Sequence, residues 1–180
     1  MLVQNYGLFW RRDRIFWGRG KRRGHLKGLY TSEQTGDVVD FRDQQGIYVL
    51  YDSSFELVYV GQAGSGERQR LFLRLKQHRS DQLADRWERF SWFGIRKVNQ
   101  DCTLKVEKKT VKPAINEVLN HIEAILIASA EPPHNRQGGR FGENVEQYLQ
   151  YHDVENIGPG VDDMVRQLWK ANRATSSKPS

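Results

Sequence analysis

The chain of 180 residues has little of several features on which proteins depend for stability or for membrane insertion. Cys102 is its single cysteine, which excludes an internal disulfide framework and a zinc site built on cysteines. No apolar run approaches the ~18 residues of a membrane-spanning helix, and residues 1–10 do not follow the pattern of a secretory leader. We therefore expect a soluble, cytoplasmic protein that has no membrane partner and can form its own core.

Two common catalytic signatures are also missing. Gly64-Ser65-Gly66 is not followed by the Gly-Lys-Ser/Thr that completes a phosphate-binding Walker loop. Apart from His78, the histidines are scattered, form no metal-ligand motif and are interpreted as non-catalytic: His25, His121, His134 and His152. A Walker-type nucleotide site and a histidine-rich zinc site are therefore excluded.

Positive charge is present and is concentrated at one end of the chain. The net charge is +6, and residues 1–30 contain eight basic residues against Asp13 alone. We expect these residues to bind nucleic-acid phosphates, with aromatic neighbours such as Trp10 and Trp17 stacking on bases. The alternatives are a solvated strand edge that deters aggregation, or a surface for a protein partner. The basic residues are Arg11, Arg12, Arg14, Arg19, Lys21, Arg22, Arg23 and Lys27.

Runs of β-branched and aromatic residues between turn residues predict short strands. In the N-terminal part they cover residues 8–10, 15–17, 25–30 and 38–41. Two more, 47–51 and 57–60, are joined by the turn-like Asp52-Ser53-Ser54 and should pair antiparallel. Another strand is expected over 91–98. Helical periodicity predicts helices over 67–79, 81–89, 113–130, 145–151 and 161–169, of which 113–130 is the most strongly periodic.

Two tripeptides mark the predicted hairpin, Gly46-Ile47-Tyr48 and Tyr59-Val60-Gly61, and polar residues follow them at helical spacings. Their order, covering roughly residues 46–136, resembles the GIY-YIG nuclease superfamily. The resemblance implies an α/β fold of the α+β kind, a small three-stranded antiparallel sheet flanked by helices. To this we expect a β-rich N-terminal and a helical C-terminal extension to be added. The residues that carry the resemblance beyond the tripeptides are Arg74, His78, Glu123 and Asn135.

The resemblance assigns catalytic roles to the residues of the hairpin and of the first helix. Tyr48 would orient or deprotonate the attacking water, which requires a lowered pKa or a transient phenolate. Tyr59 would hydrogen-bond the phosphate or the water. Arg74 would bind the scissile phosphate, and His78 would share a proton with the water or a tyrosine. Ordinary structural roles are the alternatives: strand packing for the tyrosines and a solvated basic helix face for Arg74 and His78.

The resemblance assigns metal binding to Glu123 on the later helix. This carboxylate would be the protein ligand of a single Mg²⁺ or Mn²⁺ ion, and its alternative is an ion pair with a cation such as Arg74. Asn135 would lie near the active site, or would stabilise a turn through its amide. Many members carry a lysine shortly after the second tripeptide. Here Gln62, Ala63 and Gly64 follow it, which excludes a lysine base at that place.

Together these features predict a metal-dependent endonuclease that hydrolyses phosphodiester bonds in DNA, in restriction, phage defence or DNA repair. The expected organisation is a basic, aromatic, β-rich extension (1–45), a GIY-YIG-like nuclease domain (46–141), a helical extension (142–173) and a disordered tail (174–180). A homodimer on DNA would supply two sites for a double-strand cut. The alternative from another class is a catalytically silent nucleic-acid-binding module with a nuclease-like fold.

Overall fold

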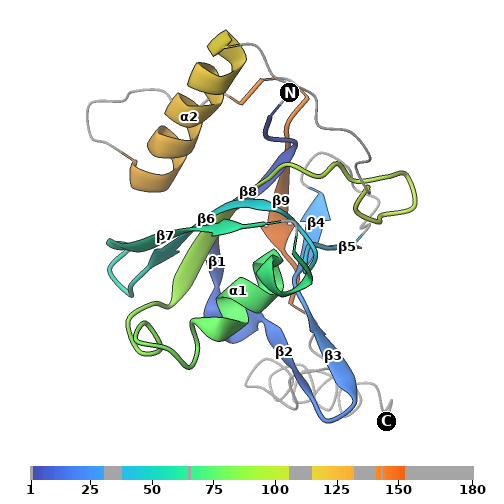
Figure 1. The fold of residues 1–180 in the computed structure, drawn as a ribbon, viewed down its shortest axis with the longest axis vertical. Coiled ribbons are helices and arrows are strands. Elements are labelled where there is room, and N and C mark those ends of the chain that lie inside the picture. Colours follow the sequence, from blue (N-terminus) through green and yellow to red (C-terminus); the bar gives the residue numbers. More distant parts are fainter. Residues whose placement is uncertain are drawn as a thin grey trace, which may run out of the picture.

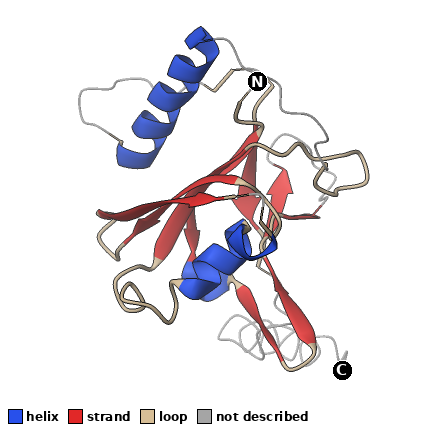
Figure 2. Cartoon of the chain, in the orientation of Figure 1, coloured by secondary structure: helices blue, strands red, loops and turns tan. Residues whose placement is uncertain are grey.

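The computed structural model describes residues 2–30, 38–64, 66–105, 115–131, 141–142 and 144–152. In this part of the chain, seven strands form one mixed sheet in the order β5-β4-β9-β1-β8-β6-β7, and β2 and β3 form a separate hairpin (Figures 1 and 2). The strands are β1 (Asn5–Arg11), β2 (Phe16–Arg19), β3 (Arg22–His25), β4 (Lys27–Tyr30), β5 (Val38–Asp40), β6 (Gly46–Tyr51), β7 (Leu57–Ala63), β8 (Arg89–Gly94) and β9 (Glu146–Gln150). The helices are α1 (Leu71–Gln77), α2 (Ile115–Ala130) and the short 3₁₀ turns η1 (Arg12–Arg14) and η2 (Glu67–Gln69).

The prediction of a small three-stranded sheet flanked by helices is wrong. β6 does pair antiparallel with β7, as the hairpin pattern predicts, and its other edge pairs antiparallel with β8. The sheet then continues, because β1 pairs antiparallel with β8 and parallel with β9, and β4 pairs with both β9 and β5. Backbone hydrogen bonding between segments far apart in sequence determines this extension, and local residue patterns do not specify such partners.

The helix predictions are confirmed only in part. The helix over 113–130 is confirmed as α2, whereas 67–79 divides into η2 and α1. Neither α-helix in the described ranges is long and apolar enough to cross a membrane. The predicted helix over 161–169 and the predicted tail lie outside the described residues.

Two predicted helices are wrong. Residues 81–86 form turns, in which the Asp81 side chain accepts a hydrogen bond from the Leu83 amide at 2.8 Å. Such local side-chain bonds compete with the helical ladder. Residues 145–151 contain strand β9, which has β1 on one side and β4 on the other. Backbone partners on both edges outweigh a weak helical period in so short a segment.

The core consists of two layers, one on each face of the sheet. Along β6, Tyr48 and Leu50 belong to the larger layer with Phe72 of α1, while Val49 and Tyr51 belong to the smaller layer with α2. This division follows the alternation of side chains along a strand. Helices α1 and α2 accordingly lie on opposite sides of the β6–β7 ribbon (Figure 1). The two faces of one strand therefore lead to two different environments.

Candidate functional site

The glycines of the two tripeptides are required by close packing. Gly46 has φ +143°, and a Cβ there would lie 1.9 Å from the carbonyl oxygen of Phe93 on β8. A Cβ on Gly61 would lie 2.3 Å from the hydroxyl of Tyr48, which faces it across the hairpin. The glycines thus allow β8 to approach β6 and leave room for the Tyr48 ring.

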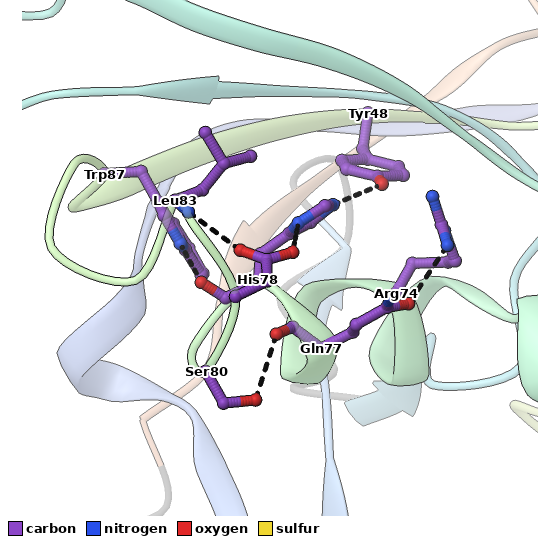
Figure 3. A network of polar contacts seen from close by, with 8 residues as sticks. Tyr48, Arg74, Gln77, His78, Ser80, Leu83 and Trp87 are labelled. Carbon is purple, nitrogen blue, oxygen red and sulfur yellow. Dashed lines mark hydrogen bonds and ion pairs between the residues drawn. The ribbon is translucent and has the colours of Figure 1, made fainter.

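Tyr48 forms a hydrogen-bonded chain with residues at and beyond the end of α1. Its hydroxyl lies 2.8 Å from Nε2 of His78, and Nδ1 of His78 lies 2.7 Å from Oδ2 of Asp81 (Figure 3). His78 follows the last residue of α1, and its carbonyl accepts a hydrogen bond from the indole of Trp87 at 3.0 Å. The histidine is therefore held from both its ring and its backbone.

The chain of contacts determines which nitrogen of His78 carries the proton. An ionised carboxylate only accepts hydrogen bonds, so Asp81 requires a proton on Nδ1. In neutral His78, Nε2 then accepts the hydrogen bond from the Tyr48 hydroxyl. Partial burial of Asp81 favours its neutral form, but hydrogen bonds from the Leu83 amide and from His78 outweigh it and keep the pKa of this carboxyl below its usual value. A hydroxyl, a histidine and a carboxylate are thus hydrogen-bonded in the same order as in a catalytic triad. Tyrosine stands here in the place of the serine.

The ionisation state of Tyr48 differs from the expected one. Its side chain has no exposed surface, and this burial raises its pKa to about 12. The positive charge of Arg74 acts in the opposite direction but is the smaller effect. The expectation of a lowered tyrosine pKa therefore fails. At neutral pH Tyr48 is a neutral hydroxyl, which can move a proton only by passing its own to His78.

Tyr59 and Arg74 lie between this buried chain and the surface. The ring of Tyr59 packs edge-on against His78 at 4.9 Å between centroids, and lies 6.1 Å from the ring of Tyr48. Arg74 donates from Nη1 to Gln77 at 3.0 Å, and its guanidinium extends from α1 toward Tyr48 (Figure 3). Its buried Nε has no partner within the described ranges. We call Tyr48, Tyr59, Arg74, His78 and Asp81 the tyrosine–histidine cluster.

A cleft of about 760 Å³ borders the cluster at the end of the hairpin. Ile47 of β6, Gln62 of β7 and Arg74 contribute to its walls, together with Phe93 of β8 and Ile125 of α2 from the α2 side of the sheet. Arg74 is the one member of the tyrosine–histidine cluster that lines this cleft. A guanidinium at the wall of an open cleft is suited to bind an anion through its terminal N–H groups.

The structure does not bring Glu123 to this cluster. The buried residues of α2 include His121 and Ala124, the latter packed beside Val49 and Tyr51 on the far face of the sheet, whereas Glu123 is exposed. No ion pair joins Glu123 to Arg74 within the described ranges, so that alternative is not observed either. Asn135 lies outside the described residues.

The metal prediction gains no support from the donor set. In the described part of the chain, no group of three or more histidine, cysteine or acidic side chains could hold a metal ion. Glu123 is a single carboxylate directed to solvent from the face opposite Tyr48. In this arrangement it does not fit the role of a ligand for an ion that acts on a phosphate at Arg74.

The N-terminal basic residues divide into two groups. Arg19, Lys21, Arg22 and Arg23 are exposed around the turn of the β2–β3 hairpin, which projects from the body of the molecule beside α1 (Figure 1). The others lie on the body: Arg11 bonded to Asp13, Arg12 over the ring of Trp87, Arg14 exposed, and Lys27 over the ring of Tyr151.

The aromatic residues among these basic residues have structural roles. Trp10 is buried in the core against Phe41 and Trp92, and it donates its indole hydrogen to the Tyr148 carbonyl. Trp17 packs on Phe72 of α1 and anchors the hairpin there. The expectation that Trp10 stacks on bases is therefore wrong, because this ring is covered by protein.

The sequence interpretation missed Asp81. Its position three residues after His78 was assigned to a helix, which would have directed it away from the imidazole. The available signal was an aspartate just beyond a helix end, a place where such side chains commonly bond nearby backbone amides. No family model, curated protein or solved structure matches the chain, so the superfamily resemblance rests on the motif residues alone.

Proposed function

We propose that this protein is a nuclease of the GIY-YIG type that hydrolyses phosphodiester bonds in DNA. The observation that supports this most is the convergence of Tyr48, Tyr59, Arg74 and His78 from β6, β7 and α1. All four belong to the motif: Tyr48 and Tyr59 come from neighbouring strands of one hairpin, and Arg74 and His78 come from the end of α1. Their meeting beside an open cleft is expected of an active site, and a chance set of strand and helix residues would seldom produce it.

The proposed mechanism is a hydrolysis in which a water molecule attacks the phosphorus atom. Arg74 binds the scissile phosphate in the cleft and neutralises the charge that develops in the transition state. Tyr48 has no exposed surface in the described structure, so substrate binding must first open a path from the cleft to its hydroxyl. Tyr48 then receives a proton from the water as it passes its own proton to Nε2 of His78. The phosphorus–oxygen bond to the leaving group breaks and the leaving oxygen takes a proton from solvent water. His78 then releases its proton through Tyr48 to solvent. Asp81 stabilises the imidazolium formed in between.

Dependence on Mg²⁺ or Mn²⁺ is part of the proposal through the resemblance alone. When bound, such an ion would stabilise charge on the phosphate and leaving oxygens. Because Glu123 does not fit the ligand role in the described arrangement, no step is assigned to the ion.

The substrate is proposed to be DNA because of the positive charge beside α1. A two-stranded ribbon with four exposed basic residues at its turn has dimensions compatible with the major groove of a duplex. Its base packs on α1 through Trp17 and Phe72, so the hairpin and the cluster are held by one helix. The proposal also includes a role in restriction, phage defence or repair in the cytoplasm. A homodimer would supply the two sites needed for a double-strand cut.

The direct test is nicking of supercoiled plasmid in Mg²⁺, with and without EDTA. We expect Arg74→Gln to lower the nicking rate by about 10²-fold or more, as for removal of a transition-state donor. Arg68→Gln is the matched control, because it removes the same charge from the exposed end of η2. Equal rates for the two variants would refute the role of Arg74.

The second candidate is a DNA-binding module that does not cut. It is favoured by the complete burial of Tyr48 and by the exposure of Glu123 on the opposite face. Plasmid binding without nicking in Mg²⁺ or Mn²⁺ would establish this alternative. Nicking that copurifies with the unsubstituted chain and is lost in Arg74→Gln would exclude it.

A further inference from the structure

A second cavity, of about 540 Å³, lies between the start of η1 and the segment that leads from α1 to β8. Its walls include two tryptophan rings, Trp17 and Trp87, which meet edge to face at 6.4 Å between centroids. Two guanidinium groups, those of Arg12 and Arg79, also line it. We call these four residues the arginine pocket.

Each guanidinium is held against a ring. The Arg12 guanidinium carbon lies 4.8 Å from the Trp87 ring centroid, and that of Arg79 lies 4.6 Å from the Trp17 ring centroid. Arg12 also donates to the backbone carbonyls of Ala84 and Trp87, which fixes its orientation. A stacked guanidinium keeps outward-facing N–H donors while its plane is immobilised. These contacts pre-organise the pocket for an anion with several acceptor oxygens.

The two arginines repel one another. Partial burial, followed by the positive charge of Arg12, lowers the pKa of Arg79 from its usual value. Within the described ranges no carboxylate forms an ion pair with either of them. Like charges placed together without a counter-ion are a common feature of anion sites, because the anion removes the repulsion when it binds.

The rim of the cavity adds further positive charge. Arg11 and Arg89 lie there together with Asp13 and Glu88, and Arg11 already neutralises Asp13 through a two-point contact. Arg89 stacks over Phe55 at 4.4 Å, and its buried Nε has no hydrogen-bond partner in the described structure. Four arginines against two carboxylates leave the lining of the cavity with a net positive charge.

The arginine pocket is connected to the tyrosine–histidine cluster. Arg79 directly follows His78, and the indole of Trp87 donates to the His78 carbonyl. We propose that the arginine pocket binds a backbone phosphate of nucleic acid, at a point separate from the phosphate held by Arg74. A base is a poorer occupant, because the guanidinium groups of Arg12 and Arg79 already lie over the tryptophan rings. This inference rests on the proposed function and adds a second contact point for the same strand.

The test is the salt dependence of DNA binding, measured by fluorescence anisotropy of a labelled duplex oligonucleotide in EDTA. Each neutralised phosphate contributes about 0.9 to the slope of log affinity against log salt concentration. We expect Arg79→Gln to lower this slope by about 0.9. Arg86→Gln, an exposed arginine of the same segment outside the pocket, should leave it unchanged. Equal thermal unfolding midpoints of the two variants would show that both fold.

The outcomes separate this inference from the proposed function. Equal slopes in the two variants, or no salt-dependent binding by the unsubstituted chain, would overturn the pocket whatever the nicking assay shows. A lower slope in Arg79→Gln alone supports the pocket, even if the unsubstituted chain never nicks plasmid. Calorimetric titration with inorganic pyrophosphate tests whether the pocket binds a free anion instead. If Arg79→Gln abolishes pyrophosphate binding while the salt slopes of the two variants stay equal, the pocket binds a free anion and the backbone contact is overturned.

Discussion

The two faces of the β6–β7 ribbon differ in kind although the same strands form both. On the α1 face, Tyr48 reaches His78 and Asp81 through hydrogen bonds, and Arg74 borders an open cleft. On the α2 face, Val49 and Phe93 pack against Ala124 in an apolar layer. Outside that layer, α2 exposes Leu119, Ile122 and Leu126. The motif strand therefore presents its polar cluster to the α1 face, while the cleft that Arg74 borders is also walled by Phe93 and Ile125 from the α2 side.

Substitution of one tyrosine on each face should give the largest difference in nicking rate between the two faces. Tyr48→Phe removes the hydroxyl that is hydrogen-bonded to His78, and under the proposed mechanism we expect nicking to slow by about 10²- to 10⁴-fold. Tyr51→Phe changes a buried tyrosine of the same strand on the α2 face and should leave the rate within about threefold. Initial rates on supercoiled plasmid measure both. Similar losses in the two variants would remove the distinction between the faces.

The next largest expected effect is on stability, and it comes from the close packing of Gly61 against Tyr48. A methyl group there meets the Tyr48 ring and hydroxyl, so Gly61→Ala should lower the free energy of unfolding by about 1–3 kcal/mol. Gly66→Ala adds the same methyl group where the nearest atoms are at ordinary contact distance, and should change stability by less than about 0.5 kcal/mol. Urea unfolding followed by circular dichroism compares them, and equal midpoints would contradict the crowded site.

Alkaline pH should weaken the α1 face. A tyrosine that ionises near pH 10 when unfolded, but only at about 12 when folded, stabilises the native state below pH 10 and loses this contribution between pH 10 and 12. For Tyr48 the loss is on the order of 2 kcal/mol. Stability measured from pH 9 to 12 should therefore fall less steeply in Tyr48→Phe than in the unsubstituted chain. Parallel curves would show that Tyr48 is not protected from ionisation.

Asp81 positions His78 and should have a smaller effect than Tyr48. We expect Asp81→Asn to slow nicking about 10-fold, because the amide can still bond the imidazole but no longer requires a proton on Nδ1. Nitrogen NMR of the imidazole should show the Nδ1–H tautomer in the unsubstituted chain and a mixture in the variant. A slower rate with an unchanged tautomer would mean that Asp81 acts in some other way.

Glu123 should have the smallest effect, and here the resemblance and the geometry disagree. The resemblance predicts that Glu123→Gln abolishes a metal-dependent activity. Its exposed position on the α2 face predicts a nicking rate within about threefold and an unchanged unfolding midpoint. Rates measured across a Mg²⁺ titration decide between them. Complete loss of nicking at every Mg²⁺ concentration would show that α2 does not hold this position in the active protein.

Local patterns predicted those elements whose stability is mostly local. The hairpin of β6 and β7 follows from two apolar runs around a short polar turn, and α2 follows from its strong period. The strand identity of β9 could not be predicted, because it depends on pairing with β1 and β4. Four of the six predicted site residues converge; of the other two, Glu123 faces solvent and Asn135 lies outside the described residues. Asp81 was missed because a turn was mistaken for a helix.

The sequence by itself determined the residues of the two tripeptides, the spacing that puts Arg74 and His78 on one side of α1, and the concentration of charge near the N-terminus. These are local properties, set by side-chain chemistry and by the period of strand or helix. Tertiary structure decided which face of the sheet each helix covers, and so brought Tyr48 to His78 and left Glu123 outside. It also joined Arg12 and Arg79 in one pocket. Such juxtapositions arise from packing and backbone pairing between distant segments, and no local pattern encodes them.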